Sequence, residues 1–525
     1  MKRIGFAFAA LAACVSLCCA RSEAPKPAPS RALHRHLSGD PGTLDPTTTG
    51  EEFGLRVEDL IFRPLVGMDK ERRFVPSLAA SWAASSDGLV YDFRLDRKAK
   101  WEDGSPVTSA DVSFTIDRIR DPKVASINWK AGFEDVVSVE TPDAQTVIVR
   151  FRKPYADRLM YFTVPIVSAA AFAKPSEVDR KPFGTGPYKL ESWVPNQSLT
   201  LRRREDAGEN ESPFPTVVFK ILPDNNVRFQ AGIRGDLDEF YVTRDQVSSA
   251  QASKEFQAND RLVKVPLFVS AMILWNLRNP WLADARVRRA LAMSWPRAET
   301  AKRLYPPDGA SLISGPYPPG VAENAPDVAP PPYDPAAAGK LLDEAGLAPG
   351  PDGIRRRGGK KVSFEFLYPT SPQIYGNLAE ILKEAYAKVG VDIVLRPLDW
   401  PTASQRIGNG EYDATPYGST PLPPTVDPYP LYHSSQFPPA GQNTGFYKNP
   451  EADRLMEAAR REMDQSKRLE LHRQIHRVLA ADPPADFLWG ADQYWGISKR
   501  LDGVETSQIG LFHFLPGPLG WRPRT

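Results

Sequence analysis

Proline is the residue that most restricts how this chain can fold. It occurs 52 times among 525 residues, which is about one residue in ten and roughly twice the usual share. Each proline lacks a backbone N–H donor and fixes φ, so it breaks helix interiors and central strands. A dense cluster at 305–335 is expected to be surface loop. The fold should therefore be rich in extended linkers and fixed turns.

The charge balance argues against nucleic acid as a partner. Lys and Arg number 66 and Asp and Glu 64, which leaves a formal net charge of +2. Because binding to phosphates needs a marked excess of basic residues on one face, we expect no nucleic acid partner. With 42% hydrophobic and 25% charged residues, the composition is that of a globular protein. Its length predicts roughly three domains at about 150 residues each.

The first residues have the pattern of an export signal. Lys2 and Arg3 precede an apolar run at 4–13 that is too short to span a bilayer, since a span takes about 20 residues. No later segment approaches that length of apolar sequence. The chain is therefore predicted to be exported rather than to cross a membrane in its body.

The end of this apolar run predicts a lipid anchor. It reads Leu-Ala-Ala-Cys, which is similar to a bacterial lipobox, so 1–13 is predicted to be a lipoprotein signal peptide and Cys14 the lipidated residue. Ordinary cleavage after Ala20 is the alternative. Residues 14–31 are rich in proline and alanine and are predicted to be a tether. All three cysteines lie in this part of the chain, so the body has no cysteine for a disulfide or a metal site.

Strand and helix patterns interleave along the body. The runs at 89–95 and 146–151 alternate or are rich in β-branched residues, and they predict strands. A strand at 362–368, a helix at 374–389 and a strand at 392–397 form a unit of the kind that builds a parallel sheet. These patterns predict an α/β fold.

Several motifs follow one another in a fixed order. They are Phe-Val-Pro-Ser-Leu-Ala-Ala-Ser-Trp at 74–82, Lys-Trp-Glu-Asp-Gly-Ser-Pro-Val-Thr at 100–108, Gly-Thr-Gly-Pro-Tyr at 184–188, Trp-Asn at 275–276, Tyr-Asp-Pro at 333–335 and Asp-Pro at 427–428. With its motifs in this order, the chain resembles family 5 of the bacterial extracytoplasmic solute-binding proteins. These proteins are receptors of peptide, opine and nickel ATP-binding-cassette importers.

The resemblance implies a two-lobe α/β fold like that of periplasmic binding proteins, with the ligand cleft between the lobes. A smaller accessory domain, at 63–182 by motif order, is added to the first lobe. The second lobe takes 271–487, and the first lobe combines 32–62, 183–270 and 488–525.

The resemblance also locates the place where a peptide would be held. In peptide-binding relatives, an aspartate upstream of an Asp-Pro or Glu-Pro pair binds the ammonium of the peptide. The corresponding position here falls near Leu422, and no carboxylate stands between Asp413 and Asp427. A lone ammonium buried beside leucine would cost several kcal/mol. The anchor is therefore predicted to be lost, unless a shifted loop lets Asp427 replace it.

Further side chains are predicted to line the pocket. Trp400 matches a family position where an aromatic residue does so, and a core indole is the alternative. Tyr417, followed by Gly418 and Ser419, is the aromatic residue nearest the altered anchor. Trp489 is predicted to lie at the hinge or in the pocket, where the chain returns to the first lobe.

Histidines are the remaining candidates for a metal site. Nickel-binding relatives use a histidine of the second lobe, and His433 lies a few residues past Asp427. His472 and His476 are predicted to lie on an exposed helix face. Because a metal site needs several correctly placed ligands, we predict no metal and no cofactor.

The motifs favour binding over catalysis. The sequence has no nucleophile elbow, no His-Glu-x-x-His and no clustered acid pair, so we predict that the protein is not an enzyme. The prediction is a lipid-anchored, extracytoplasmic, monomeric receptor that closes on a peptide or peptide-like solute and delivers it to a membrane permease. An opine, an oligosaccharide or a metal chelate as solute, and a sensory role, stay open as alternatives.

Overall fold

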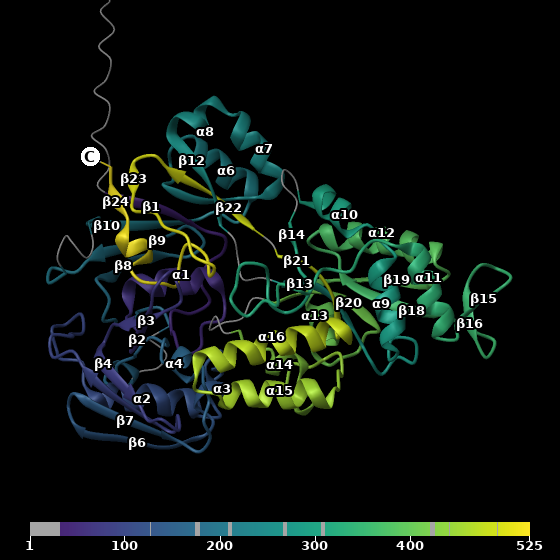
Figure 1. The fold of residues 1–525 in the computed structure, drawn as a ribbon. Helices are drawn as coiled ribbons and strands as arrows, with labels where there is room; N and C mark the ends of the chain where they lie inside the picture. The colour runs from purple at the N-terminus through teal and green to yellow at the C-terminus, as the bar shows by residue number, and fades with distance from the viewer. Residues whose placement is uncertain are drawn as a thin grey trace, which may run out of the picture.

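The computed structural model describes residues 32–126, 128–173, 179–207, 213–265, 270–305, 310–419, 426–439, 441–490 and 492–524. The predicted signal peptide, the tether and Cys14 lie outside the described residues. Three large sheets organise the described chain, and Figure 1 shows them in three separate regions of the molecule. No helix of the described residues is both long enough and apolar enough to cross a membrane.

The first sheet has seven strands in the order β12-β22-β11-β1-β10-β9-β8. Its strands are β1 (Ala32–Leu37), β8 (Tyr188–Val194), β9 (Ser198–Arg203), β10 (Thr216–Ile221), β11 (Glu239–Val242), β12 (Asp260–Val265) and β22 (Gln493–Ser498). Its helices are α1 (Glu52–Ile61), α6 (Asn225–Ile233), α7 (Arg244–Ala252) and α8 (Lys254–Asn259). Inward-facing residues alternate along β10, where Val217, Phe219 and Ile221 are buried, as expected for a strand with one face on a core.

The second sheet has six strands in the order β14-β21-β13-β20-β18-β19. They are β13 (Ser270–Trp275), β14 (Ser311–Leu312), β18 (Ser363–Pro369), β19 (Asp392–Leu398), β20 (Ala414–Ser419) and β21 (Ala485–Gly490). The helices are α9 (Ala285–Met293), α10 (Arg297–Leu304), α11 (Pro335–Glu344), α12 (Ile374–Lys388), α13 (Trp400–Gly408), α14 (Tyr429–Tyr432), α15 (Pro450–Arg461) and α16 (Gln465–Ala481). β18 and β19 are parallel and α12 joins them, which confirms the predicted strand, helix, strand unit.

The third sheet, with antiparallel strands in the order β4-β5-β7-β6, lies in the predicted accessory domain. Its elements are β4 (Ala79–Ala84), β5 (Val90–Leu95), β6 (Val136–Asp143), β7 (Thr146–Phe151), α2 (Ser109–Arg120), α3 (Lys130–Phe133) and α4 (Arg158–Tyr161). β5 and β7 confirm two predicted strands. α2 begins where Asp111 Oδ2 accepts the backbone N–H of Thr108 at 2.9 Å, a capping box that satisfies an otherwise free donor.

Small ribbons complete the described strands. They are β2 (Val66–Met68) with β3 (Phe74–Pro76), β15 (Ala348–Pro349) with β16 (Arg355–Arg357) and β17 (Lys360–Lys361), and β23 (Leu501–Asp502) with β24 (Arg522–Pro523).

The predicted return to the first lobe at residue 488 is wrong. β21 pairs with β13 through residue 490 and so belongs to the second sheet, whereas β22 is the strand that joins the first sheet. Backbone pairing sets this boundary, and motif order carries no information about pairing. Val167 and Phe172, which fall inside the predicted accessory domain, pack in the core of the first sheet. The remaining boundaries stay predictions.

The proline-rich segment lies against α16. From residue 310 to the start of α11 it holds only the short strand β14 among its described residues, as its prolines predict. His476 Nδ1 accepts the backbone N–H of Ala325 at 2.9 Å, and His476 Nε2 lies 3.1 Å from Ser314 Oγ. His472 Nδ1 lies 2.7 Å from Tyr317 Oη. Both histidines are buried, so the prediction of an exposed histidine face is wrong: the proline-rich segment covers it.

Candidate functional site

Strand directions define which edges of the two large sheets point toward each other. β12 carries the chain from the first sheet to the second, and β1, β10 and β11 run in the same direction as β12. β21 carries the chain back, and β18, β19 and β20 run in the same direction as β21. The carboxyl ends of both sets therefore point toward the other lobe (Figure 1). Loops at such ends bind ligands in open α/β sheets, which makes them the candidate site.

Trp400 lies at this edge of the second lobe. It is the first residue of α13, directly after β19, and Asp399 caps the helix by accepting the backbone N–H of Thr402 at 3.0 Å. The Trp400 side chain is 56% exposed. An exposed indole on a rigid helix start can stack on a solute at little entropic cost. The alternative of a core indole is therefore wrong, and a pocket role stays a prediction.

Tyr417, Gly418 and Ser419 form the end of β20. Tyr417 pairs with Met272 of β13, and its partly buried ring packs against the core of the second lobe. Burial raises the pKa of the Tyr417 phenol, so the hydroxyl stays protonated and can donate a hydrogen bond. Gly418 is exposed. Leu422, the position of the altered anchor, lies outside the described residues.

The Asp427 carboxylate is already bound by other groups of this protein. Its side chain is 4% exposed and forms an ion pair with Arg460, whose Nε lies 2.7 Å from Asp427 Oδ2. The same oxygen accepts a hydrogen bond from Tyr155 Oη, in the predicted accessory domain, at 3.1 Å. The backbone N–H of Tyr429 donates to Asp427 Oδ1 at 3.0 Å. In this arrangement Asp427 does not present a free carboxylate to a solute.

Trp489 is a core residue of the second lobe. It lies in β21, is 1% exposed and packs edge-on against Trp295 and Tyr305, with ring centroids 6.2 Å and 5.3 Å apart. This burial contradicts the predicted pocket role, and the hinge role stays a prediction.

A contact between the lobes involves Arg244, which the sequence did not single out. The Arg244 guanidinium, at the start of α7 in the first lobe, lies 4.1 Å from the centroid of the Tyr305 ring in the second lobe. Its Nη2 also donates to the backbone oxygen of Asp492, between β21 and β22. Lys264, near the end of β12, pairs with the Asp492 carboxylate at 2.9 Å. Asp492, in the second crossing, is thus bound both by Arg244 of α7 and by Lys264, which precedes the first crossing. No local sequence motif predicts these contacts.

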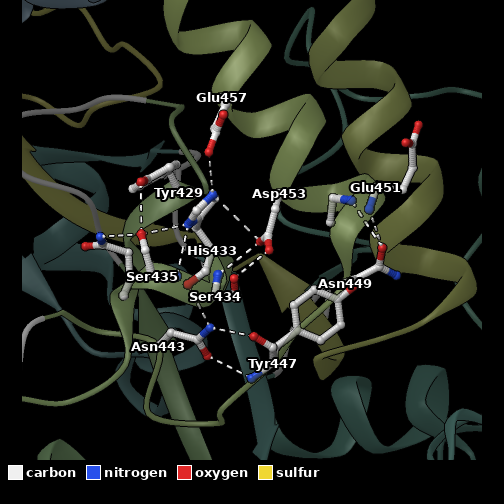
Figure 2. Close-up of polar contacts among 12 residues, drawn as sticks. Tyr429, His433, Ser434, Ser435, Asn443, Tyr447, Asn449, Glu451, Asp453 and Glu457 are labelled. Atoms are coloured by element: carbon white, nitrogen blue, oxygen red, sulfur yellow. Dashed lines mark hydrogen bonds and ion pairs between the residues drawn. The ribbon is translucent and has the colours of Figure 1, made fainter. Parts of the chain in front are cut away.

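His433 is oriented toward two carboxylates of α15. Its Nδ1 accepts the backbone N–H of Ser435 at 3.1 Å. Figure 2 shows Nε2 directed at Glu457 and Asp453, 3.4 Å and 3.9 Å from their oxygens. Within the described residues, no group of three or more His, Cys, Asp or Glu could hold a metal ion.

The chain has the two-lobe α/β architecture of the periplasmic binding proteins, as predicted. NikZ from Campylobacter jejuni in complex with Ni(L-His) superposes with a TM-score of 0.79 and 25% identity, over 94% of this chain and 100% of NikZ. AgaA from A. tumefaciens R10 in complex with agropinic acid gives a TM-score of 0.75 and 24% identity, over 94% of this chain and 99% of AgaA.

Within that class, the chain belongs to family 5 of the bacterial extracellular solute-binding proteins. The family pattern matches residues 73–439, which is more than half of the chain. The oligopeptide-binding protein AppA from Bacillus subtilis (strain 168) is 26% identical over 511 residues, which cover 93% of this chain and 91% of AppA. The family predicted from the motifs is thereby confirmed.

Proposed function

We propose that this protein is the solute-binding component of an ATP-binding-cassette importer and captures a peptide or peptide-like solute by closure of its lobes. Family membership supports solute binding as its role, and binding rather than catalysis follows from that role. The arrangement of the strands is the observation that supports lobe closure. The strands of the two sheets point their carboxyl ends toward each other, and the chain connects the sheets between β12 and β13 and between β21 and β22.

A peptide is the first choice of solute because AppA, similar over nearly the whole chain, is an oligopeptide-binding protein. A non-peptide solute is the second. It is favoured by Asp427, which is paired with Arg460 and so is not free to bind an ammonium. The structures of NikZ with Ni(L-His) and of AgaA with agropinic acid are examples of other solutes on this fold.

The setting of the receptor is also part of the proposal. The family is extracytoplasmic. We propose that Cys14 carries a lipid that anchors the chain to the membrane, that the chain acts as a monomer, and that its partner is a permease that recognises the closed form. A sensory role for the same closed form is the alternative.

A thermal-shift screen tests the proposed function. The chain from Ala32 onward would be heated with di- to pentapeptides, N-acetylated peptides, opines, oligosaccharides and nickel chelates. A true solute at 100 times its dissociation constant adds about 2.7 kcal/mol of stability, which raises the melting temperature by a few degrees. Peptides that stabilise the chain support the first choice, and another stabilising class supports the second. No shift with any class contradicts solute capture.

A further inference from the structure

Arg460, near the end of α15, lies in a cage of three side chains. Its Nε donates to Asp427 Oδ2 at 2.7 Å. Its guanidinium carbon lies 3.8 Å from the centroid of the Tyr429 ring and 4.9 Å from that of the Tyr155 ring. Asp427 and Tyr429 belong to the second lobe and Tyr155 to the predicted accessory domain. The cage therefore spans the boundary between these two parts.

The chemistry of the cage is that of a site for an organic cation. Aromatic faces attract cations, and the attraction grows when water is excluded. The Asp427 side chain is 4% exposed and Tyr155 is 7% exposed, so both are largely desolvated. A buried carboxylate without a cation would cost several kcal/mol. Burial lowers the pKa of the Arg460 guanidinium, but Asp427 and Tyr155 outweigh it and raise the pKa, so the guanidinium stays charged.

The cage residues are held by contacts that do not involve the Arg460 side chain. The Tyr429 ring stacks on His433, with centroids 4.0 Å apart, and Tyr429 Oη lies 3.0 Å from Ser435 Oγ (Figure 2). The backbone N–H of Tyr429 donates to Asp427 Oδ1 at 3.0 Å. The backbone of α15 is fixed as well, because Ala156 N donates to the backbone oxygen of Arg460 at 2.7 Å. The cage should therefore keep its shape when the guanidinium is removed.

We propose that Asp427, Tyr155 and Tyr429 form an organic-cation site that this chain fills with its own Arg460, which excludes a cationic group of the solute from that place. The cage itself does not depend on the proposed function, whereas the exclusion of solute cations rests on it. The consequence for specificity is that a solute is taken without an ammonium at Asp427, as in an N-blocked or non-peptide solute.

Chemical rescue of Arg460→Ala in the full chain tests the cage without any solute. The variant keeps the backbone contact to Ala156 and leaves room for a small cation. n-Propylguanidinium at millimolar concentration should raise its melting temperature by a few degrees and leave the unchanged chain unaffected. Arg461→Ala is the matched control, because Arg461 neighbours Arg460 on α15 but is 60% exposed and pairs with Glu457. The double variant Arg460→Ala/Asp427→Asn should not be rescued.

The outcomes separate the cage from the proposed function. Equal responses of Arg460→Ala, Arg461→Ala and the double variant to n-propylguanidinium overturn the cage. If Arg460→Ala does not fold, Arg460→Gln keeps part of the stem without the charge, and guanidinium chloride at millimolar concentration replaces the larger probe with the same expectations. A failed solute screen contradicts the proposed function but leaves the rescue result standing.

Solutes found in the screen then test the exclusion. Arg460→Ala should lower the ratio of the dissociation constants of the free and N-acetylated forms of a peptide by about tenfold or more relative to the unchanged chain. An unchanged ratio, with rescue by n-propylguanidinium intact, overturns the exclusion and keeps the cage.

Discussion

Trp400 and Trp489 belong to the same lobe but have different surroundings. Trp400 starts a helix at the edge that points toward the first lobe and is 56% exposed, whereas Trp489 is 1% exposed among core aromatics. One indole is available to a solute and the other fills the space between β21 and its helices. The two side chains therefore yield opposite expectations for the same substitution.

Replacing the exposed indole should weaken binding and leave stability nearly unchanged. Trp400→Ala removes a large contact surface, so we expect the dissociation constant of the solute to rise by about tenfold to a hundredfold. Titration calorimetry with the solute from the screen measures this. Tyr333→Ala is the control, because Tyr333 is also exposed, at 53%, but lies in the proline-rich segment. Equal affinity of the two variants would remove Trp400 from the site.

Replacing the buried indole should have the reverse effect. Trp489→Ala leaves a cavity beside Trp295 and Tyr305, which should lower the free energy of unfolding by about 3–5 kcal/mol. Urea unfolding measures the loss. Because Tyr305 contacts Arg244 of the first lobe, a smaller secondary loss of affinity is also expected. A destabilisation no larger than that of Trp400→Ala would contradict the core placement.

At the scale of elements, α16 and the proline-rich segment depend on each other. The segment has few strand or helix hydrogen bonds of its own, so α16 supplies partners through its buried histidines. A Cβ added at Gly315 would lie 2.2 Å from His476 Cδ2, so the segment approaches the helix too closely for a larger residue at that point. Burial lowers the pKa of His476 from 6.5 to about 4.

This contact predicts a pH dependence of stability. Between pH values of about 6.5 and 4 the unfolded chain binds a proton at residue 476 and the folded chain does not, so acid favours unfolding. The stabilisation is complete above 6.5 and declines by about 3 kcal/mol as the pH falls to 4. His476→Asn keeps an acceptor for the Ala325 N–H but does not titrate. Denaturant unfolding of both proteins across this range should show a shallower decline for the variant, and parallel curves would contradict the assignment.

At the scale of the whole molecule, solute should favour the closed form. The lobes touch through Arg244 and Tyr305. Adding solute should reduce the radius of gyration measured by small-angle X-ray scattering, because closure brings the two sheets together. Binding without any compaction would contradict capture by lobe closure.

The N-terminus yields a prediction about location. If Cys14 carries a lipid, Cys14→Ser should move the protein from the membrane fraction to the soluble extracytoplasmic fraction. Fractionation followed by immunoblotting measures this shift. An unchanged distribution would favour cleavage after Ala20 instead.

Sequence alone determined the family, the α/β class and many element positions. The strand pattern of β18 and the helix pattern of α12 act within a few residues, so local sequence suffices to predict them. The order of the motifs identified the family for a similar reason, because recognising sequence motifs requires no knowledge of tertiary contacts.

Tertiary structure decided the burial and the partners of the candidate residues. Tyr155 and Asp427 are 272 positions apart in the sequence and meet in one hydrogen bond, which no local pattern indicates. His472 and His476 are buried because a separate segment covers them, and Trp489 belongs to the core because β21 continues to residue 490. Burial and ion pairing depend on distant segments that only the folded chain brings together, and these contacts determine which side chains a solute can reach.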